Sequence, residues 1–516
     1  MRRWFAVLCL FLFEFVATPA QADWRIAETT HFVVYSNLPE PKLRRYAERL
    51  EKFDKALRIA RGVKETPLGK AGRVTVYMLD DRSDVSDLMG NRYIAGAYMP
   101  RAGASVAFVP ESSSEESGNS LALSGEMVLF HEYAHHFMFT TWPDAALPSW
   151  VVEGWAEFNA TAKFQKDGAL LFGSAPNYRA QGLLTGNPLP IERILGGAAG
   201  KLSGTQLEAL YGRGWALVHY LTFESSRKGQ FGAYLNAITQ DRKTPEQAAA
   251  VFGDLRALHR ELQHFISKPR INGYSIRAEL LSIPPVAIRP LREGEAAILP
   301  VRFRSERGVG PKTAPDVYAD AKKVASRYPD DPWVQRVLAE TAYDAKDYPG
   351  ALAAADRAIA ADGTLVEAHC YRAMTLMAMA VEAKDEKKES WTEIRRTIAR
   401  ANRLDTDDPR PLVLYFRSYL AQRAVPPQVA RDGLYRAYEL APQDRGLRME
   451  AATMLVASGK LAEARELLLV LTYDPHASGM GEAAAKLIDT IDAQLKSAPA
   501  DAHAPAATAV EDASPK

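Results

Sequence analysis

Cysteine is almost absent from this chain of 516 residues, which contains only Cys9 and Cys370. Cys9 lies in an N-terminal segment that we expect to be removed, so one thiol remains and no intrachain disulfide can form. The fold must therefore be stabilised by buried apolar side chains. With 47% hydrophobic and 25% charged residues, the chain is long enough for two or more globular domains.

An excess of charge of one sign is also absent. The chain has 64 lysines and arginines against 63 aspartates and glutamates, a net charge of +1. Loss of the N-terminal segment would remove Arg2, Arg3 and Glu14, which brings the net charge to zero. Because nucleic acids and anionic membrane surfaces attract strongly basic proteins, we expect neither as a partner.

Long hydrophobic runs are missing except at the N-terminus. There the apolar run Trp4–Ala17 follows two arginines and precedes Ala20-Gln21-Ala22, a pattern typical of a secretory signal peptide over residues 1–22. An uncleaved anchor is the alternative, but the run is short for a membrane span. The sequence predicts a bacterial protein that is periplasmic or secreted, with no membrane span in the mature chain.

The most informative stretch begins with His131-Glu132-Tyr133-Ala134-His135, an H-E-x-x-H motif. Residues four apart on a helix share one face, so the two histidines can bind one ion. A catalytic Zn²⁺ takes three ligands from the protein and keeps the fourth position for water. The motif therefore requires one further ligand from elsewhere in the chain.

Glu153 is the best candidate for that third ligand. Pro148-Ser149 predicts the start of a helix with Ser149 as N-cap, on which Glu153 and Glu157 lie on the same face. One glutamate can bind the ion while the other, Glu157, accepts a hydrogen bond from a ligand histidine. A structural zinc site, or one that has lost turnover, is the alternative. Glu132 argues against both, because a structural site needs no extra carboxylate.

These motifs together resemble the gluzincin metallopeptidases. Residues 147–158 read LPSWVVEGWAEF, similar to the L-P-x-W-x-x-E-G-x-A-E-[FY] of small bacterial gluzincin-like families. The resemblance implies an α+β zincin-like domain in which His131, His135 and Glu153 bind Zn²⁺ and Glu132 is the general base. The aminopeptidases of the group have a longer linker and a small residue or asparagine where this chain has Val152. Aminopeptidase specificity is therefore not supported.

A later segment, Thr205–Phe223, is predicted to be helical and resembles the Y-x-x-[SG]-x-x-L-V-x-Y-L helix of the same families. Peptide hydrolysis builds negative charge on the carbonyl oxygen, which a phenol or an imidazole facing the ion would stabilise. We expect Tyr211 to be this donor, with His219 as the reserve. The alternative is that both are packed helix residues.

Three apolar segments, residues 31–36, 73–79 and 104–109, are predicted strands, and apolar spacing predicts a helix over 42–61. In gluzincin-like folds an edge strand near the metal binds an extended peptide, and residues 104–109 are our candidate for it. An ordinary buried strand is the alternative. The polar segment 110–119 is expected to be a loop, either over the cleft or elsewhere on the surface.

Beyond residue 315 small residues recur at the offsets of a tetratricopeptide repeat (TPR), around 338–358 and again around 452–468. Residues 369–404 and 412–442 fit two looser copies, and 482–495 would cap the array. An ordinary alanine-rich bundle is the alternative. The predicted organisation is a signal peptide (1–22), a metallopeptidase domain (23–268), a linker with a small β element (269–314), an all-α TPR superhelix (315–495) and a disordered tail (496–516).

The sequence therefore predicts an exported zinc peptidase, more precisely an endopeptidase, in which a Zn²⁺-activated water attacks the peptide bond with Glu132 as general base. Its partners would be protein or peptide substrates, recruited by the repeats. The alternative is a periplasmic TPR scaffold in which the metal domain is vestigial or structural.

Overall fold

The structure is a computed structural model that describes residues 24–497 except 93, 112–122, 185–188, 197–201 and 478. The predicted signal peptide, most of the polar loop 110–119 and nearly all of the tail lie outside the described residues. None of the helices in the described part of the chain combines the length and the apolar character that a membrane crossing requires.

A mixed sheet of six strands forms the centre of the N-terminal half, in the order β4-β5-β3-β2-β1-β9. Strands β2, β3 and β5 are parallel, whereas β4, β1 and β9 join antiparallel. The strand bounds are β1 Arg25–Glu28, β2 Phe32–Ser36, β3 Val74–Leu79, β4 Ala97–Met99, β5 Val106–Pro110 and β9 Ala287–Pro290. The three segments predicted as strands thus form the parallel part of the sheet.

The predicted edge strand is not at the edge. Strand β5 lies between β3 and β4, and all of its residues are buried. The short strand β4, which the sequence analysis missed, is the outer strand instead. The edge position proposed for residues 104–109 was wrong, and the alternative of an ordinary buried strand is confirmed. Which strands become neighbours depends on long-range pairing, which local hydrophobicity does not reveal.

Both faces of the sheet are covered by helices. Alternate residues of β3 point to opposite sides: Val76 packs with α1 (Glu40–Arg61) and α3 (Gly125–Thr141), and Tyr77 packs with α2 (Arg82–Met89) and α11 (Glu293–Arg307). Two buried faces explain why the strands are continuously apolar rather than alternating.

The remaining helices of this half pack mainly on one another, and the first of them also packs on α3. They are α4 Ser149–Ala160, α5 Ala180–Leu184, α6 Ile191–Leu195, α7 Gly204–Phe223, α8 Gln230–Thr239, α9 Pro245–Ala248 and α10 Leu255–Ile266. Short 3-10 segments occur at Lys70–Gly72, Asn177–Arg179, Ser225–Arg227, Ala249–Phe252 and Ala278–Leu280. A second sheet contains β6 Lys163–Phe164, β7 Leu170–Phe172 and β8 Tyr274–Ile276.

The segment predicted as a linker, 269–314, is instead part of this half. Strand β8 pairs with β7, strand β9 pairs with β1, and α11 covers one face of the large sheet. Its prolines suggested a linker, but two of its short apolar runs are added strands. The N-terminal half therefore extends to α11.

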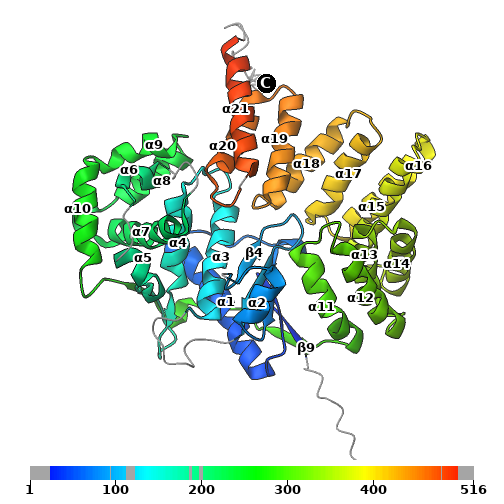
Figure 1. Cartoon of the computed structure of the whole chain (residues 1–516), viewed down its shortest axis with the longest axis horizontal. Helices are drawn as coiled ribbons and strands as arrows, with labels where there is room; N and C mark the ends of the chain where they lie inside the picture. Colours follow the sequence, from blue (N-terminus) through cyan, green and yellow to red (C-terminus); the bar gives the residue numbers. More distant parts are fainter. Residues whose placement is uncertain are drawn as a thin grey trace, which may run out of the picture.

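Ten helices form the C-terminal half of the described chain, and Figure 1 shows them following one another along an arc from α12 to α21. Neighbouring helices pack as pairs through alanines that have no exposed surface, such as Ala355 and Ala451. The bounds are α12 Ala314–Arg327, α13 Pro332–Asp344, α14 Tyr348–Ala361, α15 Val366–Glu382, α16 Lys388–Leu404, α17 Pro409–Ala421, α18 Gln428–Leu440, α19 Arg445–Ala457, α20 Leu461–Tyr473 and α21 Gly479–Ser497.

The arc returns to the N-terminal half at its far end. Arg448 of α19 donates to the carbonyl of Pro143, 2.8 Å away, and the backbone N–H of Ala102 donates to Asp444 at 2.7 Å. Tyr473 at the end of α20 donates to Glu246 of α9 at 2.9 Å. The last repeats are therefore seated beside α3, the helix that carries the H-E-x-x-H motif (Figure 1).

Candidate metal centre

Helices α3 and α4 supply the predicted ligands. Helix α3 is capped by Ser124, whose side chain accepts from the backbone N–H of Met127, and it carries His131 and His135 one turn apart. Every residue of α4 is buried, so Glu153 points into the protein. The N-cap of α4 is Pro148, so Ser149 is the first helical residue and not the cap that the sequence analysis expected.

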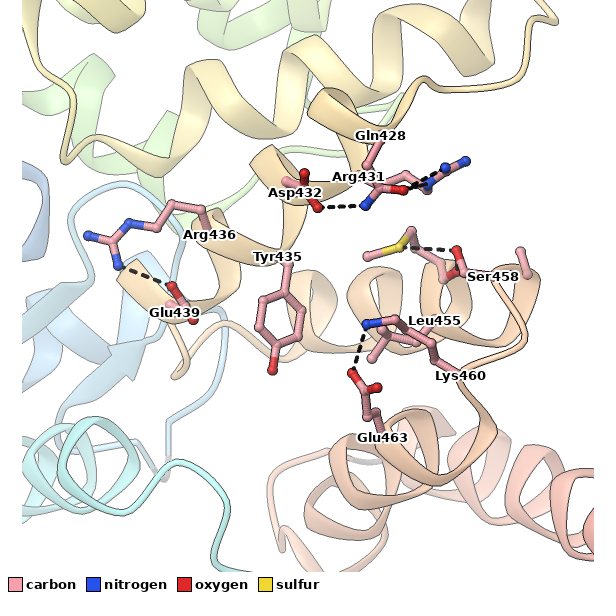
Figure 2. Close-up of a pocket in the computed structure, with 12 residues that line it drawn as sticks. Gln428, Arg431, Asp432, Tyr435, Arg436, Glu439, Leu455, Ser458, Lys460 and Glu463 are labelled. Atoms are coloured by element: carbon pink, nitrogen blue, oxygen red, sulfur yellow. Dashed lines mark hydrogen bonds and ion pairs between the residues drawn. The ribbon is translucent and has the colours of Figure 1, made fainter. Parts of the chain in front are cut away.

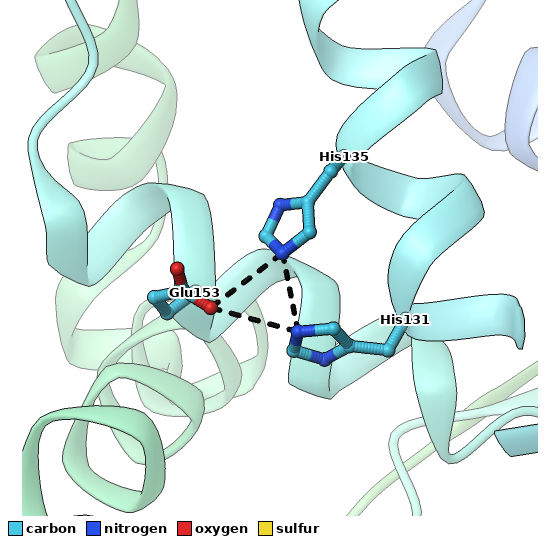
Figure 3. A group of neighbouring side chains, drawn as sticks. All are labelled: His131, His135 and Glu153. Atoms are coloured by element: carbon cyan, nitrogen blue, oxygen red, sulfur yellow. Dashed lines mark hydrogen bonds and ion pairs between the residues drawn. The ribbon is translucent and has the colours of Figure 1, made fainter. Parts of the chain in front are cut away.

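The three side chains converge on one point, as Figure 3 shows. The Nε2 atoms of His131 and His135 lie 3.1 Å apart, and each lies 3.5 Å from Oε2 of Glu153. When ligand atoms lie about 2.0–2.1 Å from Zn²⁺ in a tetrahedron, they are about 3.3 Å from one another. The triangle therefore has the size that a zinc ion requires.

The polar atoms at this point support the same interpretation. Oε2 of Glu153 is buried and forms no hydrogen bond with any described residue, although a buried carboxylate oxygen without a partner is costly. An ion at the centre of the triangle would satisfy it. Two nitrogens and one anionic oxygen are also a donor set typical of catalytic zinc.

Glu157 lies one turn after Glu153 and is held by a separate set of contacts. Its carboxylate accepts from the Tyr178 hydroxyl at 2.6 Å and from the Arg179 guanidinium at 2.7 Å. Nδ1 of His131 lies 3.6 Å from Oε1 of Glu157, longer than a normal hydrogen bond. Glu157 therefore lies beside His131, but the hydrogen bond expected between them is not formed. Tyr178 and Arg179 hold Glu157 instead, and no sequence pattern pointed to them.

Tyr211 and His219, the two candidates for the oxyanion donor, lie in different places. The Tyr211 ring stacks on the His131 ring with centroids 6.0 Å apart, so Tyr211 lies directly beside the candidate metal centre. His219 is buried, and its Nε2 hydrogen-bonds the carbonyls of Asn272 and Gly173 at 2.9 and 3.2 Å. His219 is therefore a packed helix residue, and the reserve prediction was wrong.

Two glycines bring α7 close enough for Tyr211 to reach the centre. A Cβ on Gly154 of α4 would lie 2.2 Å from the carbonyl carbon of Gly214 of α7, and a Cβ on Gly214 would lie 2.9 Å from the carbonyl oxygen of Trp150. The helix backbones therefore touch. The glycine of the E-G-x-A-E motif is needed for this crossing.

Glu132 separates two hollows. One, of about 640 Å³, is lined by His131, Glu132, Tyr211 and residues 94–96. The other, of about 410 Å³, is lined by Glu132, His135, residues 98–100 and residues of the repeats. The segment that contains strand β4 thus runs past both hollows, with Glu132 between them.

A residue from the repeats that no sequence pattern predicted reaches the centre. Nε2 of His476, in the loop between α20 and α21, lies 2.9 Å from Oε1 of Glu153. The ring of His476 is 5.1 Å from that of His135. No pattern around Asp474-Pro475-His476 indicates this role, because only the return of the arc brings the loop to α4.

The groups of the centre shift one another's pKa. Burial lowers the pKa of His135 to about 4, whereas at His131 the neighbouring carboxylates, Glu153 first, outweigh burial and raise the pKa to about 9. Burial would raise the pKa of Glu153, but His476 and the two ligand histidines hold it well below its usual range. Burial raises the pKa of Glu132. Glu153 thus remains anionic, and Glu132 moves towards the range in which a carboxyl exchanges protons near neutral pH.

Comparisons with known proteins concern the fold of the helices. No protein-family model matches the chain, and no curated protein matches it. Among solved structures the chain is similar to TTC0263, a thermophilic TPR protein of Thermus thermophilus, with 16% identity over 37% of this chain and 96% of that one and a TM-score of 0.31. The repeat part is TPR-like.

Two further solved structures are similar at 12% identity and a TM-score of 0.26. MamA of Desulfovibrio magneticus RS-1 is matched over 40% of this chain and 96% of that one, and yeast Tom70 over 57% and 62%. Such values concern the fold alone. The TPR-like description rests on the helix pairs, whose first helices begin at residues 332, 366, 409 and 445.

Proposed function

We propose that the chain is an exported zinc-dependent endopeptidase with a zincin-like catalytic half, and that it acts in the bacterial periplasm or outside the cell. The observation that carries the proposal is the ligand triangle of His131, His135 and Glu153 with the Glu132 carboxylate next to it. A structural zinc site has no need for such a carboxylate or for two hollows beside it.

In this proposal the three ligands hold Zn²⁺, which when bound polarises the substrate carbonyl and acidifies water. Glu132 accepts the proton of the attacking water and passes it to the leaving amine, a role that its raised pKa favours. Tyr211 donates to the oxygen on which negative charge develops. Glu157, held by Tyr178 and Arg179, fixes the orientation of the His131 ring.

The substrate that fits this site is an extended peptide. Strand β4 is an outer strand of the large sheet and, among the described residues, pairs with β5 alone, so its other side can pair with a peptide backbone. A peptide lying along β4 would pass Glu132 and fill the hollow on each side of it. We thus assign to residues 97–99 the binding of an extended peptide that was expected of residues 104–109.

Two variants of residues 23–516 test the proposal. We expect Glu132→Gln to keep one zinc per chain, measured by mass spectrometry, and to lose at least about 100-fold in casein hydrolysis, because the amide cannot accept the proton. Glu153→Ala is expected to lose both the zinc and the hydrolysis. Full hydrolysis by Glu132→Gln would refute the assignment.

A second candidate function is a TPR scaffold in which the metal domain is vestigial or structural, and the TPR-like helix pairs favour it. The repeats offer a surface for it. Helices α18 to α20 enclose a hollow of about 430 Å³ with exposed ion pairs, Arg436 with Glu439 and Lys460 with Glu463 (Figure 2). Next to it, Val425 and Val429 are 83% and 64% exposed. Apolar side chains beside charged ones are typical of a surface that binds proteins.

The same experiment distinguishes the two functions. A scaffold would hydrolyse no casein in the wild type, whether its metal domain binds zinc or is vestigial, and Glu132→Gln would change nothing. A peptidase that uses the repeats for its partners would lose hydrolysis in that variant and keep the partners. We likewise propose that the chain is exported, that its substrates are peptides and that its repeats bind protein partners.

A further inference from the structure

The loop between α20 and α21 holds His476 against the metal centre from the side of the repeats. Oε2 of Glu153 faces the two ligand histidines, and Oε1, its other oxygen, faces Nε2 of His476 at 2.9 Å. A carboxylate oxygen carries no proton and can only accept. Nε2 of His476 is therefore the donor of this hydrogen bond.

The loop is fixed by contacts on both sides. Asp474 accepts from the backbone N–H of His476 at 2.8 Å and pairs with Arg445 at the start of α19. The Arg445 guanidinium in turn lies over the ring of Phe139 of α3, 5.6 Å from its centroid. The His476 ring is thus held in place by α19 and by the very helix that carries His131 and His135.

We propose that His476 is a positioning residue of the metal centre, supplied by the repeats. By occupying Oε1, its N–H leaves only Oε2 of Glu153 to bind the ion and fixes the plane of the carboxylate. Groups that orient a metal ligand in this way typically contribute a factor of about 10–100 to metal affinity. The inference rests on the proposed metal site, although not on its peptidase activity.

A direct role of His476 as a fourth ligand fits the geometry less well. Its Nε2 is in contact with the oxygen that points away from the histidines, and the group that can hold an ion consists of His131, His135 and Glu153 alone among the described residues. The fourth position of the tetrahedron is thereby left for water and substrate.

The test is the zinc affinity of full-length variants, measured by competition with a chromophoric chelator. We expect His476→Ala to bind zinc about 10–100-fold more weakly than the wild type. His476→Gln, whose amide N–H can donate to the same oxygen, is expected to recover most of that loss. The matched control is His264→Ala, which removes an exposed histidine of α10 and should leave the affinity unchanged.

Two results would overturn the inference. One is a His476→Ala protein that binds zinc as tightly as the wild type. The other is equal weakening in the Ala and Gln variants, because the centre would then depend on the imidazole ring and not on its N–H donor. Since 37% of the His476 side chain is exposed, we expect the metal-free variants to melt with the metal-free wild type, and this measurement excludes a general folding defect.

The outcome is separate from that of the proposed function. A wild type that binds zinc and hydrolyses no casein would refute the peptidase and leave the role of His476 open to the same affinity measurement. Unchanged zinc affinity in His476→Ala with normal hydrolysis would refute the inference alone.

Discussion

Gly154 is where a single methyl group should damage the metal centre most. In Gly154→Ala the new Cβ would lie 2.2 Å from the carbonyl carbon of Gly214, whereas the ordinary contact distance begins at 3.4 Å. Helices α4 and α7 would have to separate by about 1.2 Å, since the neighbouring atoms are backbone and cannot turn aside. Glu153 precedes the substituted residue, and Tyr211 lies one turn before Gly214, so both would move away from His131.

The expected magnitude follows from this overlap. Overpacking of a close contact costs about 1–3 kcal/mol, of which the better helix propensity of alanine returns about 1 kcal/mol. A shift of about 1 Å at a catalytic group costs roughly 100-fold in rate. We therefore expect a modest loss of stability, a zinc affinity at least about tenfold weaker, and a much larger loss of casein hydrolysis.

The assay compares thermal unfolding, zinc affinity and hydrolysis in two glycine-to-alanine variants. The control is Gly433→Ala in the middle of α18, where the new Cβ would lie 3.8 Å from Leu412, an ordinary contact, and should be neutral or stabilising. A Gly154→Ala protein that matches this control in stability and in zinc affinity would refute the argument that the α4–α7 crossing sets the centre.

Two further predictions concern pH and metal. Glu51 and Asp54 outweigh burial and raise the pKa of His31, so its stabilisation is present below its ordinary pKa of 6.5 and is lost as the pH rises through the raised value. The free energy of unfolding of the wild type, measured with denaturant, should therefore fall as the pH rises above about 6.5. In His31→Gln this dependence on pH should be lost, and a dependence that persists in the variant would contradict the prediction. Zinc at about 100 times its dissociation constant should stabilise the wild type by about 2.7 kcal/mol, whereas the melting temperature of Glu153→Ala should not respond to zinc or to a chelator. A response in that variant would place the ion elsewhere.

The sequence predicted those elements whose formation depends on neighbours along the chain. Spacing of four on a helix places His131 and His135 on one face, and this does not depend on distant residues. The helix after Pro148 was predicted as well, but Glu153 points inwards because α4 packs against α3 and α7. The alanine pattern predicted the helix pairs from local spacing as well. Segments 31–36 and 73–79 were apolar enough to be recognised as strands.

Other parts of the site could not be predicted because they depend on long-range packing. Strand β4 is an outer strand because β5, its neighbour, pairs with β3 on the other side. Helix α11 belongs to the N-terminal half because it buries the second face of the sheet. His219 shares a helix with Tyr211, yet its partners are carbonyls of two distant residues. Helical periodicity in the sequence does not show which of the two side chains faces the centre.

The sequence by itself determined that His131 and His135 share one helix face and that small residues recur through the repeats, because both are written in spacings of a few residues that helix geometry translates directly into space. The tertiary structure decided what surrounds the ligands. The last repeats pack against the N-terminal half, and this packing places His476 next to Glu153. The pairing of the strands places β4 beside Glu132. Contacts of this kind follow from the docking of whole surfaces, whose energy is spread over many residues and leaves no local pattern in the chain.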